Sequence, residues 1–123
     1  MLDHCTASSI HDRINVWFLL DAIAQHCNKV LSTAVTTPTS VTSASLGHDA
    51  AQQYIDLITE QLDAFLDCVA PSDATGTLNL PSVIKVLKIW KRKGIFIADF
   101  IDERLSDLES RFASRHILTY FLL

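Results

Sequence analysis

Apolar residues recur every three or four positions in four segments of this chain, which is the spacing of one face of an α-helix. Ser8 or Ser9 suits the N-cap of the first segment, while Pro81 and Gly94 suit the first turn and the C-cap of the third. The pattern predicts an all-α fold, a bundle or helical superhelix of about four to five helices. The predicted helices cover residues 10–31, 49–70, 81–93 and a stretch beginning near 97.

The first predicted helix is apolar almost all the way round between residues 14 and 23, which is typical of a central helix covered on most sides. Asn15 and Asp21 interrupt this surface. We expect Asp21 to pair with Arg13 or Asn15, to face water, or to accept hydrogen bonds from a ligand. Trp17 and Trp90 are expected in the core. The other expected core positions are Tyr54, Ile58, Leu62, Phe65, Leu66 and Val69 in the second helix, Val83, Ile84 and Leu87 in the third, and Phe100, Ile101, Leu105, Leu108 and Phe112 in the fourth.

Two segments depart from the helical pattern within what we interpret as a single domain, residues 1–123. Residues 32–47 form a Ser/Thr-rich stretch that we expect to be a mobile insert, since nine of the fourteen residues from 32 to 45 are Ser or Thr. Residues 116–123 form a strongly apolar tail. Such a tail must pack against something, so self-association is an open alternative.

Composition and charge argue against several classes of protein. The net charge of −4 argues against direct nucleic-acid binding, and no apolar run is long enough to cross a membrane. We expect no signal peptide, and the odd number of widely spaced cysteines predicts reduced thiols in a cytosolic or nuclear protein.

Candidate chemistry is sparse. The sequence has no glycine-rich phosphate loop and no catalytic or Cys-x-x-Cys motif, so we expect no enzymatic activity, cofactor or metal site. His26 and Cys27 diverge by about 100° on a helix, which favours a buried thiol beside an exposed imidazole over a zinc site. An enzyme that uses His26 and Asp21 is a third, weaker alternative, because five positions separate them on the helix surface.

A basic cluster is the most distinctive feature. Five of the ten positive charges, Lys85, Lys88, Lys91, Arg92 and Lys93, lie within nine residues. Lys85, Lys88 and Arg92 share one helix face and suit a phosphopeptide or acidic partner. The alternative is a solvated face whose cations favour the helix C-terminus.

Several segments resemble a known family. Residues 13–23 (RINVWFLLDAI) and 85–96 (KVLKIWKRKGIF) are similar to two helices of the domains that bind the C-terminal domain (CTD) of RNA polymerase II. Residues 54–58 (YIDLI) and 69–76 (VAPSDATG), followed by Asn79, resemble the gamma subunit of the fungal CTD kinase I complex.

This resemblance implies the C-terminal part of a right-handed CTD-interacting superhelix and a non-catalytic nuclear subunit beside a cyclin-dependent kinase and its cyclin. That kinase phosphorylates the polymerase repeats and promotes transcription elongation. In peptide-binding relatives, the residue matching Asp21 contacts the repeat peptide, and basic residues matching Lys85 and Lys93 lie near its phosphates. The alternative is therefore a reader of phosphorylated repeats. Three further helices precede the Asp21 helix in the family, and we therefore expect exposed apolar surface on residues 14–23.

Overall fold

The computed structural model describes the backbone of residues 2–32 and 41–122, and their side chains except at positions 4, 41–46 and 115–122. This part of the chain contains five α-helices, one 3₁₀ helix and no strand, which confirms the predicted all-α class. No helix within it is long and apolar enough to cross a membrane. The helices are α1 (Leu2–Ala7), α2 (Ile10–Ser32), α3 (Val41–Val69), η2 (Ala74–Leu78), α4 (Leu80–Lys93) and α5 (Ala98–Leu122).

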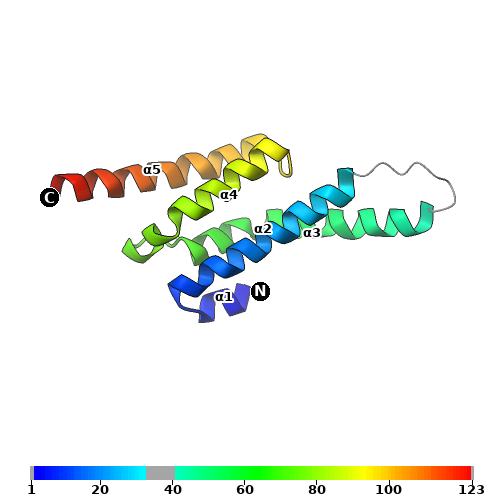
Figure 1. Ribbon diagram of the computed structural model, residues 1–123, viewed down its shortest axis with the longest axis horizontal. Coiled ribbons are helices and arrows are strands. Elements are labelled where there is room, and N and C mark those ends of the chain that lie inside the picture. The colour runs from blue at the N-terminus through cyan, green and yellow to red at the C-terminus, as the bar shows by residue number, and fades with distance from the viewer. Residues whose placement is uncertain (1, 33–40, 123) are drawn as a thin grey trace.

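Two antiparallel helix pairs build the bundle (Figure 1). The first pair is α2 with α3, the second is α4 with α5, and α4 also packs against α2. The short helix α1 lies against both members of the first pair, close to the start of α2 and the end of α3. Helix α2 therefore contacts α1, α3 and α4, as expected of a central helix, but Phe18 and Leu19 are exposed, so it is not covered on most sides as its apolar sequence predicts.

Local signals set the helix ends. The Ser9 hydroxyl accepts a hydrogen bond from the Asp12 N–H at 3.3 Å, so Ser9 is the residue that caps α2. Gly94 ends α4 in the left-handed conformation with φ of 67°, and the Ile95 N–H donates to the Trp90 carbonyl at 3.1 Å. Gly76 in η2 packs directly on the backbone of Pro71, which leaves no room for a side chain.

The core centres on a group of three aromatic side chains. Trp17 of α2 and Trp90 of α4 are fully buried with ring centroids 5.2 Å apart, and Phe96 lies 4.9 Å from Trp90. Both tryptophans are therefore core residues, as predicted. The buried Asn79 side chain donates to the carbonyls of Ile10 at 3.0 Å and Val69 at 2.7 Å, which ties the start of α2 to the end of α3.

The structure differs from the sequence expectations at α3 and α5. Helix α3 begins at Val41 rather than near 49, so the last residues of the predicted insert are helical, while 33–40 lie outside the described residues. Propagating a helix adds one hydrogen bond per residue, so the packed later turns can support a Ser/Thr-rich first turn. Tyr54 and Phe112 were predicted in the core, but their side chains are 54% and 36% exposed. Tyr54 lies on a wall of an open groove between α2 and α3, which accounts for its exposure. The α5 backbone includes residues 116–122 of the predicted tail, whose side chains, like residue 123, lie outside the described residues.

Candidate functional site

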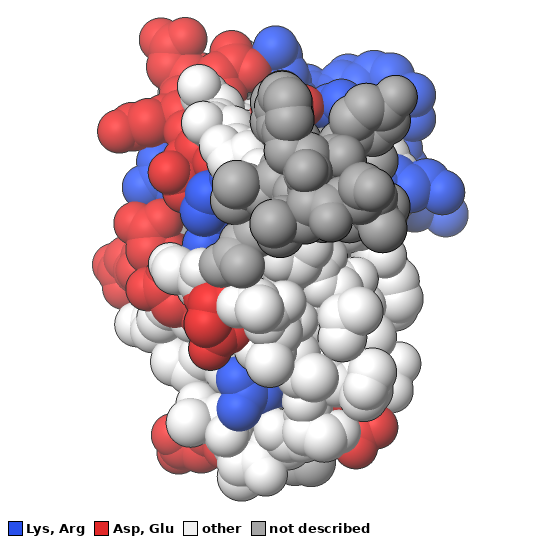
Figure 2. Space-filling view, turned by 90° about the vertical axis from the view of Figure 1, so that its left-hand side faces the viewer, with Lys and Arg blue, Asp and Glu red and all other residues white. Residues whose placement is uncertain are grey.

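The predicted basic face forms on α4. Lys85, Lys88 and Arg92 are all exposed, and a shallow groove of about 420 Å³ runs between them over Pro81, Ile84 and Ile89. Figure 2 shows basic side chains gathered along one upper edge of the molecule, acidic side chains along the opposite edge, and a largely uncharged area below. The charges are therefore segregated, although the net charge is negative.

Acidic residues of α5 partly neutralise this face. The Lys88 ammonium lies 3.1 Å from Glu109, and the Lys91 ammonium lies 2.7 Å from Asp102. Both pairs are about half exposed and contribute little to stability. Among the described residues, Lys85 and Arg92 form no ion pair, so their charges are directed to solvent.

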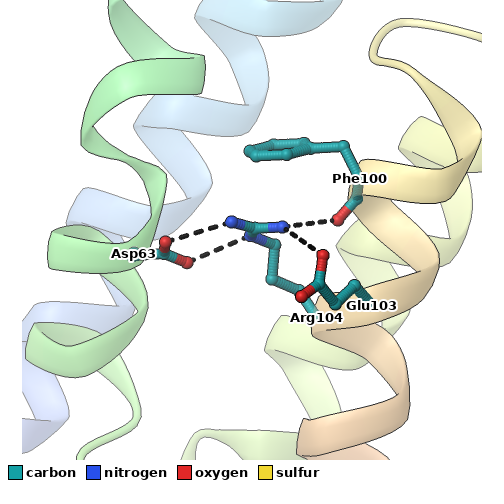
Figure 3. Close-up of polar contacts among 4 residues, drawn as sticks. All are labelled: Asp63, Phe100, Glu103 and Arg104. Atoms are coloured by element: carbon teal, nitrogen blue, oxygen red, sulfur yellow. Dashed lines mark hydrogen bonds and ion pairs between the residues drawn. The ribbon is translucent and has the colours of Figure 1, made fainter.

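Arg104 and Arg111 of α5 are structural and add nothing to the basic face. The Arg104 guanidinium donates to both Asp63 oxygens at 3.0 Å, which joins α5 to α3, and it lies 3.8 Å from the centre of the Phe100 ring (Figure 3). It also donates to the Phe100 carbonyl at 3.0 Å. Arg111 donates to the Ala70 carbonyl at 2.9 Å, just past the end of α3. Because these hydrogen bonds join α5 to α3 and to the residue after it, neither guanidinium can bind a ligand without breaking contacts between the two helices.

Asp21 lies at the contact between α2 and α4. One of its oxygens, Oδ1, accepts hydrogen bonds from the Trp90 indole N–H at 2.7 Å and from Gln25 at 2.9 Å. The Lys93 ammonium donates to the other end of the Gln25 amide at 2.5 Å. The structure thus brings Asp21 and Lys93 together through Gln25, on a different side of α4 from Lys85, Lys88 and Arg92.

Arg13 and Asn15, the partners considered for Asp21, are directed elsewhere. The Arg13 guanidinium donates to the carbonyls of Thr6 at 3.2 Å and Cys68 at 3.0 Å, and Asn15 is exposed. The sequence did not identify the actual partner because Trp90 lies 69 positions away and approaches Asp21 only in the folded bundle.

An exposed apolar face runs along α2. Phe18 and Leu19 are 46% and 52% exposed, and Ala22 and His26 continue the same side of the helix. The spacing i, i+1, i+4 and i+8 places these four side chains in one stripe. Exposed apolar surface was predicted for residues 14–23, and the structure confirms it at Phe18 and Leu19, whereas Trp17 is buried.

A groove of about 560 Å³ between α2 and α3 adjoins this face. Its walls are almost entirely apolar or small, which suits the side chains of a docked helix. The exposed Tyr54 and Leu57 extend the apolar surface along α3. The groove is lined by Ala22, Ile23, His26, Cys27, Val30, Gly47, Ala50, Ala51 and Tyr54.

The His26–Cys27 pair has the geometry expected of non-ligands. His26 is exposed and Cys27 is buried, and burial raises the pKa of the Cys27 thiol, so it stays protonated at neutral pH. Within the described ranges, no group of three or more His, Cys, Asp or Glu side chains is placed to hold a metal ion.

Sequence reasoning missed two parts of the site. Gln25 links Asp21 to Lys93, and the i, i+4 spacing of Asp21 and Gln25 was the available signal. The exposed pair Tyr54 and Leu57 was also missed. Tyr54 follows the apolar spacing of α3 and was therefore predicted to lie in the core. Only the position of α2 leaves that side of α3 uncovered.

Comparisons with known proteins identify relatives. Residues 1–97 match the model of a protein family described as CTD kinase subunit gamma CTK3. The chain is also similar to the protein named HUA2-LIKE 3 of Arabidopsis thaliana, with 27% identity over 103 residues. That match covers 84% of this chain and only 6% of the plant protein. No solved structure matches the chain.

Proposed function

Because the chain belongs to the CTD kinase subunit gamma family, we propose that it is the non-catalytic scaffold subunit of a nuclear kinase complex that phosphorylates the RNA polymerase II repeats and promotes elongation. Its partners are then a cyclin-dependent kinase and a cyclin. In this proposal residues 1–123 form one helical unit that resembles the C-terminal part of a CTD-interacting domain. The contribution of the chain is a binding surface, and the phosphoryl-transfer chemistry belongs to the kinase.

The exposed apolar face of α2 carries this proposal. Phe18 and Leu19 are large apolar side chains about half exposed on the central helix of the bundle, next to an apolar groove. Exposed apolar surface of this kind marks sites where proteins bind one another. A helix laid along the face would bury both side chains and enter the groove, which is the usual geometry of helix-in-groove recognition.

Reconstitution with purified kinase and cyclin tests the proposal. The full chain should form a stable complex that elutes as one species in size-exclusion chromatography with light scattering. Replacing a central apolar contact costs about 1–2 kcal/mol or more, so Leu19→Ser should weaken the complex about tenfold or more and lower repeat phosphorylation at limiting subunit concentration.

Ile97→Ser is the matched control. Ile97 is also a large exposed aliphatic residue, 77% accessible, but it lies in the turn between α4 and α5, away from the α2 face. This variant should assemble like the unmodified chain. Equal assembly of the Leu19→Ser and Ile97→Ser variants would contradict the proposed surface. The mass of the chain alone, measured in parallel, shows whether the face binds a second copy instead.

A second function, reading phosphorylated polymerase repeats, is favoured by one observation. Lys85 and Arg92 carry charges with no acidic partner among the described residues and flank a groove. A phosphate there would gain charge-assisted hydrogen bonds. Against this function, the Asp21 oxygen expected to bind the peptide already accepts bonds from Trp90 and Gln25.

Titration with phosphorylated and unphosphorylated repeat peptides separates the two functions. A reader should bind only the phosphorylated peptide, more weakly as salt concentration rises, and Lys85→Ala should abolish that binding. Lys91→Ala is the control with the same change of charge, because Lys91 is paired with Asp102. Absence of phosphate-dependent binding would refute the reader and leave the scaffold function intact.

A further inference from the structure

A pair of thiols lies where α1 meets the end of α3. The sulfur atoms of Cys5 and Cys68 are 2.9 Å apart, although the residues are 63 positions apart in the chain. Cys5 is fully buried, and Cys68, in the last turn of α3, is half-buried. Both are free thiols in this structure.

The surrounding hydrogen bonds hold the two cysteines in place. The Arg13 guanidinium donates to the carbonyl of Cys68 itself at 3.0 Å and to the carbonyl of Thr6, next to Cys5, at 3.2 Å. The Thr6 hydroxyl lies 3.8 Å from the Cys68 sulfur. The Arg13 guanidinium therefore joins the backbone next to Cys5 to the backbone of Cys68.

We propose that Cys5 and Cys68 form a site of reversible oxidation, in which a low-molecular-weight disulfide such as glutathione disulfide converts the two thiols into an intramolecular disulfide. The bond length of a disulfide is about 2.0 Å, so the sulfurs need to approach by less than about 1 Å. A movement of that size is within side-chain rotation. In a reducing compartment such a bond is transient, which makes it suited to sensing the redox state.

The exchange runs in two steps. The accessible Cys68 loses its proton to water and its sulfur attacks one sulfur of glutathione disulfide, which forms a mixed disulfide and releases one glutathione thiolate. Cys5, which burial keeps protonated, then loses its proton to the departing thiolate and attacks the Cys68 sulfur, releasing the second glutathione. The chain loses two hydrogen atoms and two electrons, and glutathione disulfide is reduced to two glutathione molecules.

Oxidation would fix α1 to the end of α3. Without it, α1 is a helix of six residues held by packing and by the bonds of Arg13. A Cys5–Cys68 disulfide closes a loop of 63 positions, so it constrains the unfolded chain and should raise Tm by roughly 10 °C. The disulfide should also make the backbone of α1 more resistant to proteolysis.

The test incubates the full native chain with glutathione disulfide, unfolds it in denaturant so that buried thiols become accessible, alkylates the remaining thiols, and maps them by mass spectrometry. Before alkylation the expected product is two hydrogens lighter than the reduced chain and reverts with dithiothreitol. After alkylation it carries one alkyl group, on Cys27, and yields a peptide that links Cys5 to Cys68. Cys27→Ala should behave in the same way, because Cys27 lies towards the end of α2, whereas α1 packs near the start of that helix (Figure 1). Cys68→Ser should lose the product and the Tm shift.

Three results would overturn the proposal. They are a mixed disulfide that persists on Cys68 of the unmodified chain, a disulfide that includes Cys27, and Cys68 that stays fully alkylable at a glutathione disulfide excess that oxidises a control dithiol peptide. Circular dichroism of Cys68→Ser shows whether that variant folds. If it does not, Cys5→Ala provides the second readout, since it should retain glutathione on Cys68 at least tenfold more than the unmodified chain does.

Discussion

Trp17 and Trp90 provide a matched experiment on one hydrogen bond. Both indoles are fully buried and their rings are in contact. They differ at the ring nitrogen: Trp90 donates to Asp21 at 2.7 Å, whereas the buried Trp17 nitrogen has no partner within the described part of the chain. Changing either tryptophan to phenylalanine removes a similar amount of apolar contact. At Trp90 the change also removes a hydrogen bond, whereas at Trp17 it removes a buried donor that has no partner.

The magnitudes separate the two variants clearly. Loss of the larger ring costs about 1–2 kcal/mol of unfolding free energy at either position. At Trp17 the change also removes a buried unpaired donor, which relieves about 1–3 kcal/mol, so Trp17→Phe should be close to neutral. At Trp90 it removes a hydrogen bond to a partly exposed carboxylate, worth about 1–2 kcal/mol, so Trp90→Phe should lose about 2–4 kcal/mol.

Urea unfolding followed by far-UV circular dichroism measures both variants without relying on indole fluorescence. A double-mutant cycle with Asp21→Ala isolates the bond, and the coupling between Trp90→Phe and Asp21→Ala should be about 1–2 kcal/mol. Coupling between Trp17→Phe and Asp21→Ala should be smaller, because Trp17 contacts the ring of Trp90 but donates no hydrogen bond to Asp21. Equal losses for the two phenylalanine variants, or no coupling at Trp90, would refute the reasoning.

Three further predictions concern packing, an ion pair and pH. Gly76→Ala should lower the free energy of unfolding by more than about 3 kcal/mol in the same urea assay, because the new Cβ would overlap the backbone carbonyl of Pro71. Gly47→Ala is the control: its Cβ would lie in open space, so this variant should be neutral or stabilising. Arg104→Lys should lose about 1 kcal/mol, since lysine cannot keep both bonds to the exposed Asp63, and a loss unaffected by salt would contradict an ionic origin. Burial raises the pKa of the Cys5 thiol from 9.0 to about 12, so unfolding releases its proton above pH 9. The stability that this thiol contributes is present below pH 9, and the free energy of unfolding should fall between pH 9 and pH 12 by up to about 1.4 kcal/mol per pH unit. The free energy of unfolding of Cys5→Ala should fall less steeply over the same range.

The helices that the sequence predicted well are those with local end signals. Ser9 caps α2, Pro81 lies in the first turn of α4, and Gly94 ends α4, so the observed bounds lie within one or two residues of the predicted ones. Helix α1 was missed because six residues are too few to form a stable helix alone. Burial of Cys5 and the bonds of Arg13 stabilise it, and both depend on the folded bundle.

The candidate site was predictable only in part for a related reason. Helical spacing places Lys85, Lys88 and Arg92 on one face, because neighbours on a single helix need no tertiary information. The partner of Asp21 and the connection to Lys93 join α2 to α4, and spacing within one helix carries no information about such contacts.

The use of arginine bears on which of the two functions is stronger. Arg13, Arg104 and Arg111 all donate to carbonyls or carboxylates of neighbouring segments of the chain, so the basic face of α4 presents one arginine, Arg92, beside Lys85 and Lys88. A lysine attracts phosphate as a point charge but lacks the bidentate geometry that makes arginine selective. Only Arg92 can supply that geometry on this face, so phosphopeptide binding here should be weak and sensitive to salt.

The exposed apolar face of α2 differs from these arginines, because the stability of the folded chain does not explain why this face is apolar. Leu19 is half exposed, so Leu19→Ser removes little core packing and should leave the urea midpoint almost unchanged. If the same variant loses the kinase–cyclin complex, the side chain acts through a partner. If the urea midpoint falls by as much as it does for a core substitution, the face contributes to the stability of the chain itself and the scaffold proposal loses its main support.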